Sequence, residues 1–112
     1  MSSEKKSAGV YYGSRLAGIL KKNAAGYVFA YDGDYLKIPG AMPISLSLPL
    51  SPTQYESSQL FPFFEGLLPE GWLLDITSAV AKIDKTDQFS LLLHIGRDPI
   101  GAVSIQPIEE FS

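Results

Sequence analysis

The chain has 112 residues, of which 46% are apolar and 19% charged; this is the size and composition of one globular domain and excludes a disordered chain. Its net charge is -3 and its 9 basic residues are scattered, so direct binding to nucleic acid is not expected. Cysteine is absent, which excludes a disulfide framework, a thiolate nucleophile and a cysteine metal site.

The first residues are polar and predict a flexible tail over residues 1–8, followed by a single domain over residues 9–109. Residues 1–7 lack the apolar run of a signal peptide, and no later run approaches the ~18 apolar residues of a membrane helix. We therefore expect a cytoplasmic protein that does not bind membranes, and the lack of cysteine fits a reducing compartment.

Short apolar runs separated by turn residues predict a β-meander in the first third of the chain. Residues 10–12 and 16–20 form two such runs, with a Gly-Ser pair between them. Residues 27–31 alternate aromatic and small side chains, so the three aromatic side chains are expected on one face of a third strand.

Residues 44–50 carry the clearest strand pattern, because every second side chain is apolar. Pro49 places this strand at an edge of the sheet or at the strand's own end. We expect its apolar face to pack on the segment that follows and to join the sheet to the helices. The predicted core residues are Ile44, Leu46, Leu48, Leu50, Phe63, Phe64, Leu67 and Leu68.

The second half of the chain predicts helices and one returning strand. A short helix is possible over 54–64, and a helix over 69–83 would carry an apolar stripe along one side. A further helix is predicted over 88–95, ended by Gly96, and a last strand over 100–108. The predicted fold class is α+β: an antiparallel sheet or meander with two or three helices packed on one side.

Residues that could perform chemistry are few. His94 lies in an apolar helical turn without a Ser or Cys nucleophile motif, which favours a structural or capping role. Asp32, Asp34, Asp84 and Asp87 suit turns and helix caps better than a metal site. The two glycines of the segment 96–102 fit no nucleotide-binding motif. We therefore assign no catalytic residue, no cofactor and no metal, and we predict that the protein is not an enzyme.

Four motifs, in order along the chain, resemble one known family. They are Ser-Leu-Ser-Leu-Pro-Leu at 45–50, Phe-Phe-Glu-Gly-Leu-Leu-Pro-Glu at 63–70, Phe-Ser-Leu-Leu at 89–92 and Ile-Gly-Arg-Asp-Pro-Ile-Gly-Ala-Val at 95–103. Together they resemble the amino-terminal subdomain of HipA-type serine/threonine kinases, which are toxins of bacterial toxin-antitoxin modules. The resemblance runs from about residue 10 to residue 107, and the kinase body with its ATP-binding loop and catalytic Asp is not present.

A free-standing subdomain of this kind resembles the HipS antitoxins of tripartite HipBST modules. The resemblance implies an antitoxin that binds and inhibits a separate HipA-like kinase, HipT, while a helix-turn-helix protein, HipB, binds the DNA. An alternative is a regulatory or structural fragment of a complete HipA-like kinase. A third hypothesis, from another class, is an enzyme with a small site around His94 and Asp98.

The segment 60–72 gathers three Phe and the only Trp of the chain around two Pro and two Gly, so it forms either the centre of a core or a surface for a partner. Trp72 could seal the core or project as an anchor. An apolar stripe at Leu73, Ile76, Val80 and Ile83 is complete without it, and acidic neighbours would give it a polar rim, which favours the anchor. The predicted partner-binding residues are Glu65, Leu68, Pro69, Glu70, Gly71 and Trp72.

Overall fold

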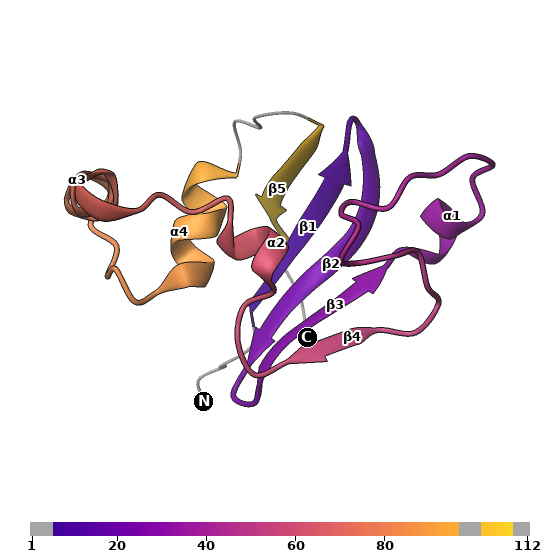
Figure 1. The fold of residues 1–112 in the computed structure, drawn as a ribbon, viewed down its shortest axis with the longest axis horizontal. Helices are drawn as coiled ribbons and strands as arrows, with labels where there is room; N and C mark the ends of the chain where they lie inside the picture. Colours follow the sequence, from indigo (N-terminus) through magenta and orange to yellow (C-terminus); the bar gives the residue numbers. More distant parts are fainter. Residues whose placement is uncertain (1–5, 97–101, 109–112) are drawn as a thin grey trace.

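The computed structural model describes residues 6–96 and 102–108. Within these residues, five strands form one antiparallel sheet in the order β4-β3-β2-β1-β5 (Figure 1). The strands are β1 (Lys6–Tyr12), β2 (Arg15–Asn23), β3 (Gly26–Tyr31), β4 (Tyr55–Ser57) and β5 (Val103–Pro107). The predicted α+β class is confirmed.

The first three strands form the predicted meander. β1 begins at Lys6, so the last three residues of the expected tail over 1–8 belong to the sheet, and Ala8 is fully buried. The turn between β2 and β3 is closed by Asn23, whose Oδ1 accepts hydrogen bonds from the backbone N–H groups of Ala25 (2.8 Å) and Gly26 (3.1 Å). This is the local chemistry that makes Asn common in turns.

The alternation in β3 places its side chains as predicted. Tyr27, Phe29 and Tyr31 are buried on one face, whereas the residues between them are half-buried on the other. Gly18 on the neighbouring strand makes room for Phe29: a Cβ there would lie 2.8 Å from the Phe29 ring and 2.5 Å from the Ala30 carbonyl oxygen. The aromatic face of β3 therefore depends on a residue without a side chain beside it.

The predicted strand over 44–50 is wrong. The segment is a tight turn closed by an isolated bridge between Ser45 and Leu48. Ile44 and Leu48 are buried, as expected, but Leu46 is 95% exposed and Leu50 37% exposed, so the latter two are not core residues. The backbone of this segment bonds to tyrosine hydroxyl groups instead of to a neighbouring strand, which is why an alternating pattern here does not form a ladder.

Four helices occur in the described residues, two of them a single turn long. They are α1 (Gly33–Leu36), α2 (Pro62–Glu65), α3 (Gly71–Ala81) and α4 (Gln88–Ile95). The bounds of α4 match the prediction, and Asp87 caps it by accepting a hydrogen bond from the Ser90 N–H. The helix considered over 54–64 is wrong, because Tyr55 pairs with Phe29 in the sheet and only the turn after Phe61 is helical.

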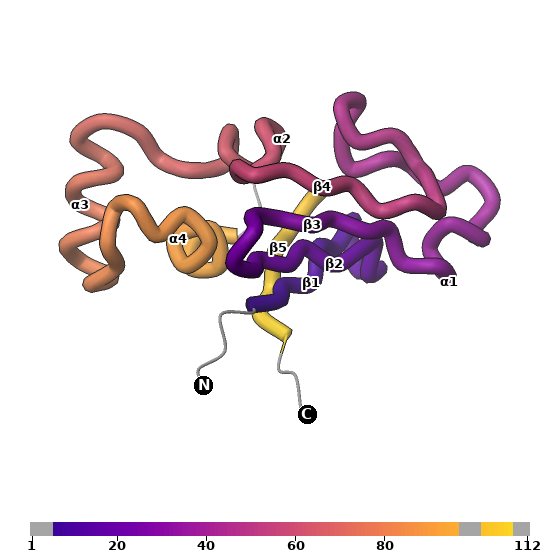
Figure 2. Tube along the Cα trace, turned by 90° about the horizontal axis from the view of Figure 1, so that it is seen from below, coloured from indigo at the N-terminus to yellow at the C-terminus, as the bar shows by residue number. Residues whose placement is uncertain are grey.

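One core joins the sheet to the helices α1, α2 and α4. Phe29 from β3 meets Phe64 from α2, with ring centroids 5.8 Å apart, and Phe89 and Leu92 from α4 are fully buried in the same cluster. Phe63, Leu67 and Leu68 pack against this cluster but are only partly buried. Figure 2 shows α2 and the long loop before β4 on one side of the sheet.

The last strand is shorter than predicted within the described residues. β5 begins at Val103 and pairs with β1, and the Ile105 N–H also bonds to the Gly96 carbonyl at 2.9 Å. The turn expected at Asp98 and Pro99, and the start of the strand predicted from residue 100, lie outside the described residues.

Candidate partner-binding surface

Helix α3 has no buried residue, although its sequence is rich in apolar side chains. Trp72, Ile76 and Val80 are spaced four residues apart and therefore share one face. Their exposed fractions are 73%, 48% and 76%, and Leu73 beside them is 49% exposed. The helix lies beyond α4, at the end of the molecule away from the sheet (Figures 1 and 2). We call these four side chains the α3 apolar face.

Local interactions determine where α3 begins and ends. It begins at Gly71, two residues later than predicted. The φ of Gly71 is +59°, in the left-handed region, so the helix does not extend back to Pro69. It ends at Ala81, and the capping residue Lys82 is also left-handed, with a φ of +60°; the Lys82 N–H bonds to the Ser78 carbonyl. An ion pair between Asp75 and Lys85 ties the helix to the segment before α4.

Four of the six predicted partner-binding residues line one open cleft of about 290 Å³ between α2, α3 and α4. Its lining residues are Pro62, Glu65, Gly66, Leu68, Pro69, Glu70, Leu74, Lys85, Gln88 and Leu91. Gly71 and Trp72 lie outside this lining, at the start of α3. The structure thus brings the predicted residues to one region, with the cleft on one side and the α3 apolar face on the other.

The possibility that Trp72 seals the core is excluded by its exposure of 73%. Glu70, two residues before Trp72, is exposed, and Glu65 is exposed on the lining of the cleft together with Lys85; no ion pair to either carboxylate is found among the described residues. Leu68 and Pro69 are half-buried, and Leu68 packs against the core. A large aromatic side chain is therefore exposed two residues after an exposed carboxylate.

The apolar stripe predicted along this helix is exposed. Leu73, Ile76 and Val80 are on the helix surface, and nothing in the described residues covers them. Helical periodicity shows which side chains share a face, but it does not show whether the face meets the same chain or another one. The lack of a second apolar helix of comparable length to pack against was the signal available in the sequence.

The described residues contain no obvious chemical centre. His94 is exposed in the last turn of α4, and no three His, Asp or Glu side chains of the described chain approach closely enough to hold a metal ion. Asp32, Asp84 and Asp87 accept hydrogen bonds in caps and turns, as predicted. No helix of the described residues is long and apolar enough to span a membrane.

Solved structures and family models agree on the fold. A family model described as HipA N-terminal domain matches residues 8–106. A solved structure, "N-terminal domain of HipA toxin", superposes with a TM-score of 0.74 at 31% identity and covers 99% of this chain and 100% of that one. The resemblance inferred from the four motifs is therefore confirmed.

Relatives of two sizes are similar to the chain. A Haemophilus influenzae protein named "Uncharacterized protein" is 38% identical over 101 residues, which cover 90% of this chain and 92% of that protein. Two Sinorhizobium fredii proteins, named "Putative kinase Y4mE" and "Putative kinase Y4dM", are 29% and 31% identical over 90% and 88% of this chain. The matches cover only 24% and 25% of those two proteins. With a family model that spans residues 8–106, the chain belongs to the HipA N-terminal domain family.

Proposed function

We propose that this protein is an antitoxin that binds a separately encoded HipA-like serine/threonine kinase and inhibits it, as a HipS protein does for HipT. The observation that carries the proposal is the α3 apolar face: Trp72, Leu73, Ile76 and Val80 are exposed on a helix that buries none of its residues. Apolar side chains that gather on a surface mark sites of interaction with other molecules. Membership of the HipA N-terminal domain family supports a kinase as that other molecule.

Trp72 is the central contact in this proposal. Tryptophan is enriched among the few residues that dominate binding energy, and such residues are typically surrounded by polar groups at the interface rim. Glu70, two residues before Trp72, would supply part of that rim. We propose that Trp72 and the turn 67–71 insert in or beside the active cleft of the kinase, where they hinder substrate or the activating motion.

The chain has no catalytic role in this proposal. A helix-turn-helix protein of the HipB kind would complete a ternary complex and supply its contacts with DNA. The net charge of -3 supports that division, since the phosphate backbone of DNA selects for basic surfaces.

A second candidate function is that of a regulatory or structural subdomain of a complete HipA-like kinase. It is favoured by the two relatives named as kinases, in which the matched region is about a quarter of the protein. The neighbouring reading frame distinguishes the two functions. A separate frame that encodes a kinase without this subdomain supports the antitoxin, whereas one continuous frame supports the subdomain.

The test is Trp72→Ala, with Trp72→Phe as the conservative variant and Lys21→Ala as a control at an exposed position of β2. Because Trp72 is mostly exposed, the thermal melting temperature should stay within a few degrees of the wild type. Affinity for the kinase should fall about thirtyfold or more, since truncating a central Trp typically costs at least ~2 kcal/mol.

The readouts are binding to the purified kinase, inhibition of its activity, and growth of cells that express the kinase. Trp72→Ala should lose rescue, Trp72→Phe should retain part of it, and Lys21→Ala should rescue like the wild type. Full rescue by Trp72→Ala with unchanged affinity would remove Trp72 from the mechanism. A wild-type chain that neither binds nor inhibits the kinase would refute the proposed function.

A further inference from the structure

We propose that the turn 44–50 is a second contact site for the same kinase, and that Leu46 enters an uncharged, apolar pocket on it. This inference rests on the proposed function and deepens it. The motif at 45–50 plays no part in the α3 apolar face, so a separate reason is needed for the way in which the turn is displayed.

Apolar side chains project from this turn. Leu46 is 95% exposed, and it is flanked by Met42 at 55% and Leu50 at 37%. We call these three side chains the Leu46 tip. Full exposure of a leucine gains nothing for the isolated fold, because its burial would be worth roughly 1.5 to 3 kcal/mol.

The backbone beneath the Leu46 tip is held by three tyrosine hydroxyl groups. Tyr31 accepts a hydrogen bond from the Ile44 N–H at 3.1 Å and donates one to the Leu48 carbonyl. Tyr35 donates to the Met42 carbonyl, and Tyr55 donates to the Pro49 carbonyl at 2.7 Å. The rings of Tyr31 and Tyr35 stack with centroids 6.2 Å apart. A side chain on such a fixed backbone loses little conformational entropy when it binds.

Two hydrogen bonds close the turn 44–50 and leave Leu46 pointing away from the core. Ser45 and Ser47 bond to each other through their hydroxyl oxygens at 2.9 Å, and the Leu48 N–H bonds to the Ser45 carbonyl at 3.0 Å. Ile44 and Leu48 on either side are buried and attach the turn to the core. Leu46 therefore stands at the apex between two anchored residues.

The composition of the loop that carries the Leu46 tip indicates the chemistry of its partner. No Asp, Glu, Lys, Arg or His occurs anywhere in residues 38–54. The loop itself therefore makes no ionic contact with phosphate groups or with a charged peptide. It fits an apolar pocket on a protein, of the kind that the well-packed centre of an interface provides.

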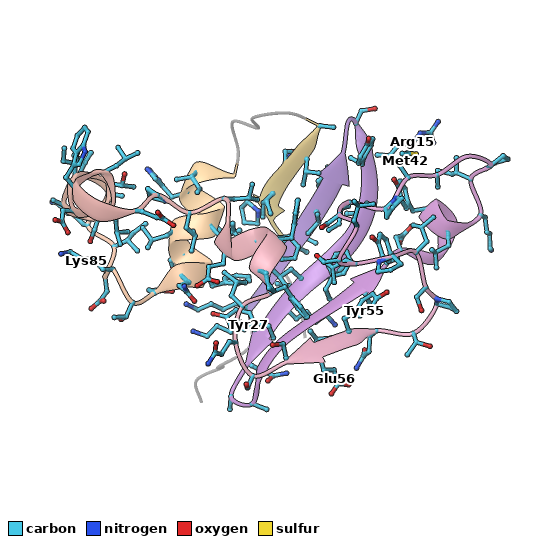
Figure 3. All side chains as sticks on the ribbon, in the orientation of Figure 1. Arg15, Tyr27, Met42, Tyr55, Glu56 and Lys85 are labelled. Carbon is cyan, nitrogen blue, oxygen red and sulfur yellow. The ribbon has the colours of Figure 1, made fainter. Side chains whose placement is uncertain are left out.

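The position of the tip indicates that one partner reaches both surfaces. In Figure 3, Met42 and Lys85 lie toward opposite ends of the molecule, whose longest extent is 43 Å. In Figure 2, the loop that carries the tip and the segment leading from α2 into α3 rise on the same side of the sheet. A compact protein of about 300 residues is about 50 Å across, so a kinase seated on this side spans the distance.

The experiment measures the affinity of the full chain for the purified kinase. Leu46→Ser should weaken binding about tenfold while the melting temperature stays unchanged, because the side chain touches nothing in the fold. Thr53→Ala is the matched control: it is exposed in the same uncharged loop and only its backbone N–H is bonded. The double variant Leu46→Ser with Trp72→Ala should show the product of the two single effects, as expected for distant sites.

The two proposals fail in different ways. If the wild type does not bind the kinase, both are wrong. If it binds, and Trp72→Ala weakens binding while Leu46→Ser does not, only the second contact is overturned. If Leu46→Ser leaves the kinase bound but releases the helix-turn-helix protein from the complex, the tip serves another partner and this inference is also wrong.

Discussion

Phe64 and Leu46 are both large apolar residues that the sequence pattern assigns to the core, yet they differ completely in exposure. Phe64 is fully buried and Leu46 is 95% exposed. We expect Phe64→Ala to lower the free energy of unfolding by about 3 to 5 kcal/mol, because it removes a ring and leaves a cavity. Leu46→Ala is the control and should change it by less than about 0.5 kcal/mol. Urea midpoints measure both, and equal midpoints would contradict the assignment.

At the residue scale, sequence periodicity predicted faces better than it predicted burial. The alternation in 27–31 gave the correct buried face, because β3 pairs with β2 across a short turn of the meander. The same alternation in 44–50 predicted Leu46 and Leu50 inside and failed. The bonds from tyrosine hydroxyls that replace a strand ladder there come from residues 31, 35 and 55, and no local pattern encodes them.

At the scale of elements, Asp87 caps the start of α4, and the protonation of its carboxylate links the stability of the fold to pH. Burial acts to raise its pKa, but hydrogen bonds from Ser90 and the charges of Lys6 and Lys22 together hold the pKa below the usual 3.8. The Ser90 hydroxyl donates to Asp87 at 2.7 Å, and Lys6 Nζ lies 3.9 Å away. The carboxylate form is therefore favoured in the folded protein.

We predict that Asp87→Asn removes part of the pH dependence of stability. A pKa that is lower in the folded than in the unfolded chain gives stability that is present above the unfolded value of ~3.9 and is lost as pH falls through the folded value. The difference in unfolding free energy between wild type and Asp87→Asn should shrink below about pH 4. The pKa of Asp84 is also lowered, so Asp84→Asn serves as the comparison that shows how much of the pH dependence comes from this second carboxylate. A difference that stays constant from pH 7 to pH 2 would contradict this prediction.

Helix α3 should be the least stable element of the described chain. None of its 11 residues is buried, and no side chain caps its first turn. Isolated helices shorter than about 12 to 15 residues are marginal in water. We expect its amides to exchange with solvent much faster than those of β2, and to become protected when the kinase binds. Amide hydrogen exchange measures this, and equal protection of α3 and β2 in the free chain would contradict it.

Elements with strong local signals were predictable, and their partners were not. The meander and α4 followed from turn residues, alternation and a capping Asp that precedes the helix by one position. The six predicted partner-binding residues do lie in one region, because they are nearly consecutive in sequence. The extension of that region along α3 could not be predicted, since an amphipathic helix has the same pattern whether it faces its own core or another protein.

At the scale of the molecule, apolar side chains are exposed at two ends, on α3 and on the turn 44–50. The α3 apolar face is presented on a helix with only local support, whereas the Leu46 tip is held rigidly by tyrosines. An interface with one mobile and one fixed contact would gain affinity from the fixed contact at low entropic cost and order the helix on binding. Hydrogen exchange in the complex would separate these contributions.

The charge distribution of the whole molecule bears on DNA binding. Its net charge is -3, and the labelled cations Arg15 and Lys85 lie toward opposite ends of the structure in Figure 3. Neutralising several adjacent phosphates requires basic side chains on one surface, and such binding weakens steeply with salt. We therefore predict no gel shift of operator DNA by this chain alone at physiological salt, and no ATP turnover, since the sequence contains no phosphate-binding loop or catalytic Asp motif.

The positive control is a complex that includes the helix-turn-helix protein and the kinase: it should shift the DNA, and omission of this chain should change the size of the shifted complex without abolishing it. A salt-resistant shift by the chain alone would show that a basic surface is not required, and would move the DNA contact from the partner to this domain.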